Sequence, residues 1–136
     1  MNIKNTKEIA EQLAQELPSR VYALTGELGA GKTTFAQFFL RALGVTEPIT
    51  SPTFVIVKSY QLSVTRFTHA YHIDAYRLKD PHELLSLGFT DIINNPHAIV
   101  LIEWADRVRD LIPHDARWIH FQHGTRDDER MILLTS

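Results

Sequence analysis

One segment of the chain carries the residue types and the spacing of a phosphate-binding loop. Residues 26–33 match the pattern G-x-x-x-x-G-K-[ST], whose glycines let backbone N–H groups turn inward around a phosphate. In such a loop Lys32 reaches the β- and γ-phosphates, and the hydroxyl of Thr33 binds Mg²⁺. A helix that begins directly after the loop adds a field that favours anions. The segment therefore predicts binding of a nucleoside triphosphate together with Mg²⁺.

Two acidic residues stand at the ends of predicted strands. Asp74 closes the run 69–73, and Glu103 closes the run 99–102. Burying a carboxylate at the end of a strand is costly, and a bound Mg²⁺ would offset that cost. Both acids are therefore candidates for metal binding or catalysis, and Glu103 is the stronger candidate because its strand is more clearly central. The alternative is that each acid caps the turn or helix that follows it.

Apolar runs and turn residues around the loop predict the elements that hold it. Residues 21–24 are apolar and follow a Pro-Ser turn, which indicates a buried strand. Residues 34–43 predict a helix that ends at Gly44. A chance match in a glycine-rich turn is the alternative, and the order of strand, loop and helix argues against it.

The rest of the chain predicts an α/β layer architecture with a mixed parallel and antiparallel sheet. Two β-rich runs, 53–62 and 64–73, indicate an antiparallel hairpin, and 98–102 indicates a fully buried strand. Some strands are thus joined through helices and others through hairpins. Further predicted elements are a first helix capped by Asn5 or Thr6, a short helix over 81–87, a helical turn over 105–111, and last strands over 118–122 and 131–134.

The composition limits the class of protein. A chain of 136 residues favours a single domain over residues 1–136. The absence of cysteine excludes disulfides, thiolate catalysis and cysteine zinc sites. A net charge of −2 does not favour broad contact with nucleic acid. No signal peptide or membrane-spanning run is recognisable, so a cytoplasmic location is expected.

Five motifs occur together along the chain. They are GELGAGKTTF at 26–35, SPTF at 51–54, HIDAYRL at 72–78, DPHELLSLGF at 80–89 and LIEW at 101–104. On these motifs the chain resembles the bacterial TsaE (YjeE) family, small P-loop ATPases required for threonylcarbamoylation of adenosine 37 in tRNA. Many NTPases share the phosphate loop, so the other motifs make the resemblance specific. Glu27 departs from the aspartate usual in the family, a change that leaves the loop backbone free to bind phosphate.

The resemblance implies a three-layer P-loop NTPase-like fold and an Mg²⁺-dependent ATPase that partners stimulate. It implies ATP and Mg²⁺ as cofactors, TsaB-like and TsaD-like proteins as partners, and contact with tRNA only through that complex. Hydrolysis of ATP would reset the assembly rather than make the threonylcarbamoyl group. The chain has no guanine-specifying N-K-x-D segment, so ATP is implied in preference to GTP.

The resemblance also implies roles for individual residues. Lys32, Glu103 and Asp74 are the implied catalytic residues; Thr33, Glu103 and Asp74 are the implied metal site, with the general base left open between the two acids. From the residues alone, helix capping by Thr6, packing of Trp104 and solvent exposure of Arg130 stay open. The implied nucleotide-binding residues are Thr6, Gly26, Leu28, Gly29, Ala30, Gly31, Lys32, Thr33, Thr34, Thr53, Trp104 and Arg130.

Two other functions are alternatives to the ATPase. One is a small-molecule or nucleoside kinase, although the chain leaves little room for the lid and substrate domain of such enzymes. The other is an ATP-dependent binding switch without useful hydrolysis. The seven histidines also raise the question of a transition-metal site. His72 and Asp74 share a strand face, but no third ligand is placed by spacing, so no such site is expected.

Overall fold

The computed structural model describes the backbone of residues 3–27, 31–49, 56–63, 66–123 and 130–135. It describes the side chains of 6–27, 31–49, 56–63, 66–122 and 132–135. In chain order the elements are α1 (Ile3–Glu16), β1 (Val21–Gly26), α2 (Lys32–Ala42), β2 (Val57–Gln61), β3 (His69–Asp74), α3 (Pro81–Ser86), α4 (Phe89–Asn94), β4 (Ala98–Glu103), the 3₁₀ helix η1 (Ala105–Leu111), β5 (Arg117–His123) and β6 (Arg130–Thr135).

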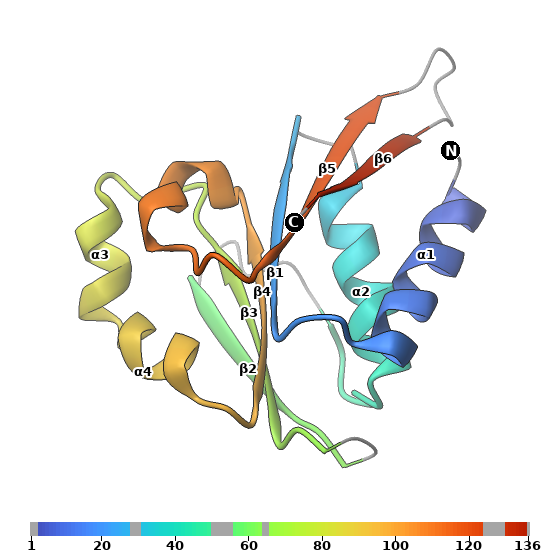
Figure 1. The fold of residues 1–136 in the computed structure, drawn as a ribbon, viewed down its shortest axis with the longest axis horizontal. Helices are drawn as coiled ribbons and strands as arrows, with labels where there is room; N and C mark the ends of the chain where they lie inside the picture. Colours follow the sequence, from blue (N-terminus) through green and yellow to red (C-terminus); the bar gives the residue numbers. More distant parts are fainter. Residues whose placement is uncertain (1–2, 28–30, 50–55, 64–65, 124–129, 136) are drawn as a thin grey trace.

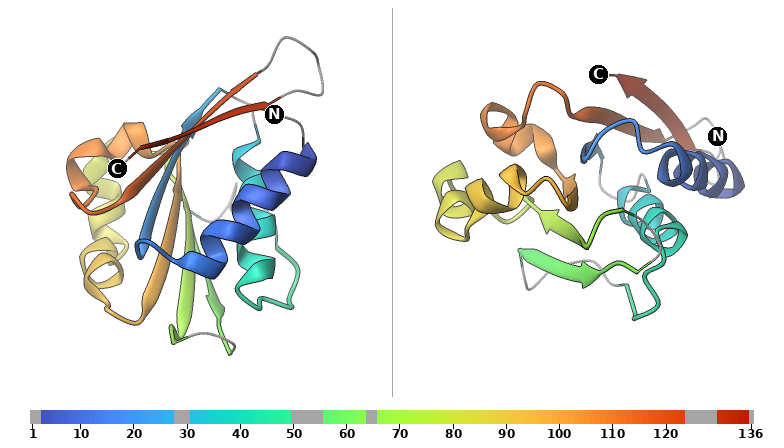
Figure 2. Two further views of the ribbon diagram at one scale, coloured as in Figure 1. Left: turned by 45° about the vertical axis from the view of Figure 1, so that its right-hand side comes forward. Right: turned by 60° about the horizontal axis from the view of Figure 1, so that its bottom comes forward.

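The strands form one six-stranded sheet in the order β2-β3-β4-β1-β5-β6. The four inner strands run parallel, and β2 and β6 pair antiparallel at the two edges. Figure 1 shows α1 and α2 on one face of the sheet and α3, α4 and η1 on the other. Both views in Figure 2 keep α1 and α2 on the face opposite α3 and α4. This arrangement confirms the predicted α/β fold with a mixed sheet between two helical layers.

The core is divided by the sheet into two apolar clusters. Because successive side chains of a strand point to opposite faces, Tyr22 and Leu24 of β1 pack with the helices α1 and α2. Val21 and Ala23 of the same strand pack on the other face, where α3, α4 and η1 cover them. Every residue of β4 is buried. The central strands β1 and β4 therefore place apolar side chains on both faces of the sheet, as the sequence predicts for 98–102.

Several element boundaries differ from the predictions. α1 begins at Ile3, so Asn5 and Thr6 lie inside the helix and do not cap it; such residues cost little in a helix interior. The strand predicted over 64–73 begins only at His69. The backbone N–H of Leu62 donates to the Thr68 carbonyl, and this bond closes the loop between β2 and β3.

The helix α4 was not predicted. Gly88, interpreted as the end of the previous helix, has a left-handed φ of 87° and is also the N-cap of α4. One glycine therefore ends one short helix and begins the next. The helix before it, α3, is held by a capping box in which Asp80 accepts from the backbone N–H of His82 at 2.9 Å. No helix within the described ranges is long and apolar enough to cross a membrane.

Candidate functional site

Lys32, Asp74 and Glu103, three of the predicted site residues, lie at the carboxyl end of the parallel strands. Because β1, β3 and β4 run parallel, their carboxyl ends lie together, and Asp74 is paired in register with Glu103. β1 ends at Gly26, and α2 begins at Lys32 a few residues later. The fold therefore places the start of α2 beside both acids, at the edge where ligands bind in open parallel sheets.

Glu103 is the centre of a buried polar cluster. Glu103 is 2% exposed, and each oxygen of its carboxylate has a partner. Oε1 accepts a hydrogen bond from the Thr33 hydroxyl at 3.0 Å, and Oε2 lies 2.5 Å from Nε2 of His72. A hydroxyl and a carboxylate oxygen thus adjoin at the start of α2. Mg²⁺ prefers such oxygen ligands and commonly takes only one or two carboxylates besides phosphate and water, so these residues fit that ion.

Lys32 is buried in the first turn of α2. Its ammonium donates to the carbonyl oxygens of Gly26 at 2.6 Å and Glu27 at 2.9 Å. It also lies 4.0 Å from the centre of the Trp104 ring. The pKa of Lys32 is lowered, because the effect of burial outweighs the opposing charges of nearby carboxylates, of which Glu103 has the largest effect. The ammonium is therefore directed toward the carbonyls of the loop that would surround a phosphate.

Trp104 covers one side of this lysine. Its backbone is left-handed, with a φ of 57°, where β4 gives way to η1. Such a conformation costs a non-glycine residue about 1 kcal/mol and is often retained at functional sites. The indole ring also lies 4.8 Å from the ring of Tyr76. The ring of Trp104 thus lies between Lys32 and Tyr76, and its predicted contact with nucleotide stays a prediction.

Comparison with known proteins identifies the family. A family model described as threonylcarbamoyl adenosine biosynthesis protein TsaE matches residues 1–132. The chain belongs to the TsaE family. Its sequence is 38% identical over 137 residues to the tRNA threonylcarbamoyladenosine biosynthesis protein TsaE of Bacillus subtilis, a match that covers 100% of this chain and 82% of that protein. The fold is similar to a crystal structure of Bacillus subtilis YdiB, with a TM-score of 0.77 and 29% identity over 99% of this chain and 81% of that one.

Two other members of the TsaE family extend the comparison. The TsaE protein of Haemophilus influenzae is 36% identical over 131 residues, which are 96% of this chain and 78% of that protein. The TsaE protein of Rickettsia felis is 41% identical over 113 residues, which are 82% of this chain and 63% of that protein. These names connect the family to the biosynthesis of threonylcarbamoyladenosine in tRNA, as the resemblance implied.

Part of the predicted TsaE-family site falls outside the described residues. Leu28, Gly29, Ala30 and Thr53 lie there, and so does the side chain of Arg130, whose backbone pairs with His123. Their contacts with nucleotide stay predictions. Among the other predicted residues, Gly31 is the N-cap of α2 with a left-handed φ of 108°. Thr34 is in the first turn of α2, and Thr6 is buried in α1.

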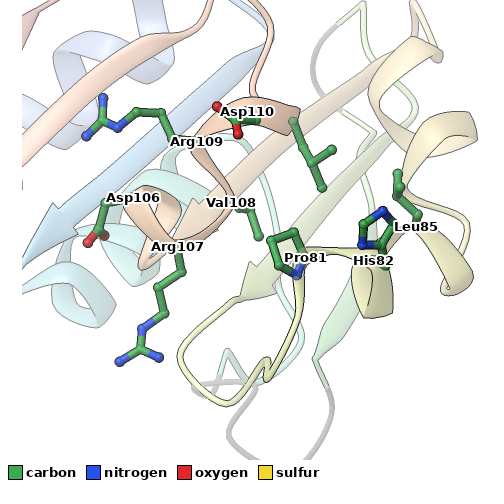
Figure 3. A pocket seen from close by; sticks show the side chains of 9 residues that line it. Pro81, His82, Leu85, Asp106, Arg107, Val108, Arg109 and Asp110 are labelled. Atoms are coloured by element: carbon green, nitrogen blue, oxygen red, sulfur yellow. The ribbon is translucent and has the colours of Figure 1, made fainter.

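Within the described part of this TsaE-family fold, two hollows flank η1. The first, of about 520 Å³, opens beside Gly26 and is also lined by Trp104, His120 and Phe121. The second, of about 390 Å³, lies between α3 and η1, and in Figure 3 Arg109 extends away from α3. Asp106 and Arg109 line both hollows. Only the first hollow adjoins the phosphate loop, although Thr6 is not among the residues that line it.

Sequence reasoning missed three residues near the site. His72 was considered only as half of a metal site, and the structure pairs it with Glu103. Tyr76 lies in the HIDAYRL motif, and its place in that motif could have indicated a role at the site, but no role was assigned to it. Arg107 of η1 lies 5.1 Å from the Tyr76 ring and 5.7 Å from the Trp104 ring. Nothing in the local sequence distinguishes Arg107 from other arginines on an exposed turn.

Asp74 is a buried acid whose ionisation opposes folding. Asp74 is 7% exposed, and its Oδ1 accepts from the backbone N–H of Tyr76 at 2.9 Å. Burial raises the pKa of the Asp74 carboxyl, the Tyr76 hydrogen bond lowers it, and the nearby charge of Glu103 raises it again. The folded state thus holds the proton more tightly than the unfolded chain does. The associated stability is present at low pH and is lost as the pH rises through the folded pKa.

We expect Asp74→Asn to raise the free energy of unfolding at pH 7.5 by roughly 1 kcal/mol, a common size of gain when a destabilising group of a functional site is replaced. The amide keeps the acceptor for Tyr76 and removes the buried charge. Urea unfolding between pH 4 and pH 8 should show this gain shrinking as the pH falls toward about 4, the ordinary value of the aspartate pKa.

Asp80→Asn is the matched control. Asp80 is exposed, and hydrogen bonds from His82 lower its pKa. Its contribution to stability is therefore present above the unfolded pKa and is lost as the pH falls. This variant should gain no stability at pH 7.5. A loss of stability in Asp74→Asn, or a gain that does not vary with pH, would contradict the assignment of Asp74 as a destabilising buried charge.

Proposed function

We propose that this TsaE-family chain is a Mg²⁺-dependent ATPase that acts in forming N6-threonylcarbamoyladenosine at position 37 of tRNA. The observation that carries the proposal is the hydrogen bond from Thr33 to Glu103, at 3.0 Å, next to Lys32. A loop that only binds phosphate needs no buried carboxylate there. Hydrolysis requires groups that hold the metal and orient water, and two acids lie at the adjacent strand ends.

Each polar side chain of the site has a proposed task. Lys32 exchanges the carbonyls of Gly26 and Glu27 for β- and γ-phosphate oxygens. Thr33 and Glu103 hold Mg²⁺, which supplies positive charge against the phosphate oxygens. Glu103 and Asp74 orient a water whose oxygen bonds to the γ-phosphorus as the bond to the bridging oxygen breaks. The products are ADP and inorganic phosphate, and the proton of the water leaves through a carboxylate.

The nucleoside part of ATP has a suitable place in the hollow beside Gly26. The two acids stand at the ends of β3 and β4, on one side of β1. The hollow extends toward β5 and β6, on the other side, where Phe121 and Leu133 offer apolar surface. A triphosphate lying across the loop would therefore direct its γ-phosphate toward the acids and its base toward this hollow. Contacts of Thr6, Thr34, Thr53 and Arg130 with ATP belong to the same proposal.

The proposal includes partners and location. We infer that residues 1–136 act as one domain with TsaB-like and TsaD-like proteins. The tRNA is contacted through that complex, in the cytoplasm. ATP turnover then resets the assembly, and the partners complete a site that is slow by itself.

The test is ATP turnover measured for the chain alone and with a TsaB-like and TsaD-like pair added. We expect slow release of phosphate by the chain and a clear increase with the pair, both dependent on Mg²⁺. Lys32→Ala is the control for contaminating activity, and it should lose turnover in both conditions because the phosphates lose their buried cation. A rate that the pair leaves unchanged, with phosphate transferred to a nucleoside, would replace the proposal with a kinase.

A further inference from the structure

We propose that His72 is a positioning residue that reserves one oxygen of Glu103 and leaves the other for Mg²⁺ or its water. The inference rests on the proposed function of Glu103. Nε2 of His72 lies 2.5 Å from Oε2 of Glu103, whereas Oε1 accepts a hydrogen bond from the Thr33 hydroxyl, at 3.0 Å. The two oxygens of one carboxylate therefore have partners of different kinds: a core imidazole and a side chain of the phosphate loop.

The strand order creates this contact. β3 and β4 are parallel neighbours, and His72 is in register with Leu101, two residues before Glu103. Residues two apart on a strand share a face, so Glu103 and Leu101 face the same side. Leu101 and Ala70 belong to the cluster beneath α1 and α2. His72 thus reaches Glu103 from the neighbouring strand β3, and Thr33 reaches it from α2, the helix that covers this face of the sheet.

Packing alone does not explain a histidine at this position. His72 is 0% exposed, and its Nδ1 has no hydrogen-bond partner among the described residues. A buried polar nitrogen without a partner costs free energy that an apolar side chain of similar size would not incur. The contact with Glu103 is the only hydrogen bond of the imidazole in the described structure. The histidine therefore bears the free-energy cost of an unpartnered Nδ1 while its other nitrogen holds the carboxylate of Glu103.

The division of oxygens has a mechanical consequence. When Thr33 turns its hydroxyl toward a cation, Oε1 loses its partner and becomes available. Oε2 stays with His72, so the carboxylate keeps its orientation while its environment changes. A preorganised carboxylate needs no reordering when the ligand arrives, and partners that orient a metal ligand commonly contribute about 10- to 100-fold in affinity or activity.

The experiment compares His72→Asn with His72→Gln. Both are amides, but the shorter asparagine ends near the position of Nδ1, whereas glutamine reaches toward the position of Nε2. His72→Leu, which has no donor, is a further variant. Tyr60→Phe is the matched control, because Tyr60 is buried on the neighbouring β2 and its hydroxyl has no partner among the described residues. Folding is checked by urea unfolding, metal binding by Mn²⁺ affinity in the presence of ADP, and catalysis by kcat and KM for ATP.

We expect His72→Asn and His72→Leu to lower kcat and Mn²⁺ affinity by about 10-fold or more, with KM for ATP within about threefold of the parent. His72→Gln should recover most of both, and Tyr60→Phe should change neither. Equal behaviour of the Asn and Gln variants, or parental Mn²⁺ affinity in both His72→Asn and His72→Leu, would overturn the inference. If His72→Asn or His72→Leu does not fold, the other of the two is compared with His72→Gln. If His72→Gln does not fold, His72→Asn and His72→Leu are compared with the parent. If the parent itself does not hydrolyse ATP, the proposed function fails, and Mn²⁺ affinity still judges the role of His72.

Discussion

Glu103→Ala should reduce ATP turnover by about 100-fold or more, the usual scale for losing a catalytic acid or base. ATP binding should change little, because Lys32 and the loop backbone provide most of the contacts with the phosphates. The expected result is therefore a fall in kcat with a nearly unchanged dissociation constant for ATP. Glu103→Gln, which keeps the size of the side chain and removes its charge, should lose turnover to a similar extent. Phosphate release and equilibrium binding of an ATP analogue measure the two quantities.

Asp110→Asn is the control for a general effect of removing negative charge near η1. Asp110 lines the hollow between α3 and η1 and is exposed, so it should keep the parental rate. Because Glu103→Ala also removes the partner of a buried imidazole, its stability is measured separately by urea unfolding. If folded Glu103→Ala hydrolysed ATP like the parent, the catalytic assignment of Glu103 would be wrong. If the variant lost ATP binding as well as turnover, Glu103 would instead be needed to maintain the structure of the phosphate loop.

Gly26→Ala should destabilise the protein by at least about 3 kcal/mol, combining backbone strain with overpacking. Gly26 has a φ of 141°, a conformation that side chains rarely adopt. A Cβ at this position would clash with the backbone carbonyl oxygen of Phe121 in the neighbouring β5. Backbone cannot move aside as a flexible side chain can, so β1 and β5 would have to separate at the site. Urea unfolding measures the loss, and ATP affinity should fall with it.

Gly88→Ala provides the control for the strain alone. Gly88 also has a positive φ, of 87°, but a Cβ there would meet nothing within 4 Å. The expected loss is about 1 kcal/mol, the cost of a left-handed conformation without a clash. ATP affinity should stay at the parental value, since Gly88 lies between α3 and α4. Equal losses in the two variants would mean that the contact between Gly26 and Phe121 has no energetic importance.

Much of the fold was predictable because its signals are local. The apolar run 98–102 predicted a buried strand, and β4 spans Ala98–Glu103 with every residue buried. The short helices were harder. α4 has six residues and begins at the glycine that ends α3, so the stop signal of one helix concealed the start of the next. The cap predicted at Asn5 or Thr6 was wrong, because capping residues also occur inside helices.

For the candidate site, the residues were predictable from the sequence but the contacts between them were not. The residues of the loop are contiguous, so their spacing alone predicted phosphate binding, and the acids were recognisable because each stands at the end of a predicted strand. Their mutual contacts were not predictable. Thr33, His72 and Glu103 come from α2, β3 and β4, and they meet only because β3 and β4 are parallel neighbours.

The sequence by itself determined the family and the chemical types available at the site. Motifs are contiguous stretches of residues, and both periodicity and motif spacing are readable without knowing how the chain folds. The tertiary structure decided which partner each oxygen of Glu103 has, where the ammonium of Lys32 points, and why Gly26 admits no side chain. These are contacts between segments that lie far apart in the chain. They depend on strand order and register, which result from the burial of all the strands together and are not encoded in any one segment.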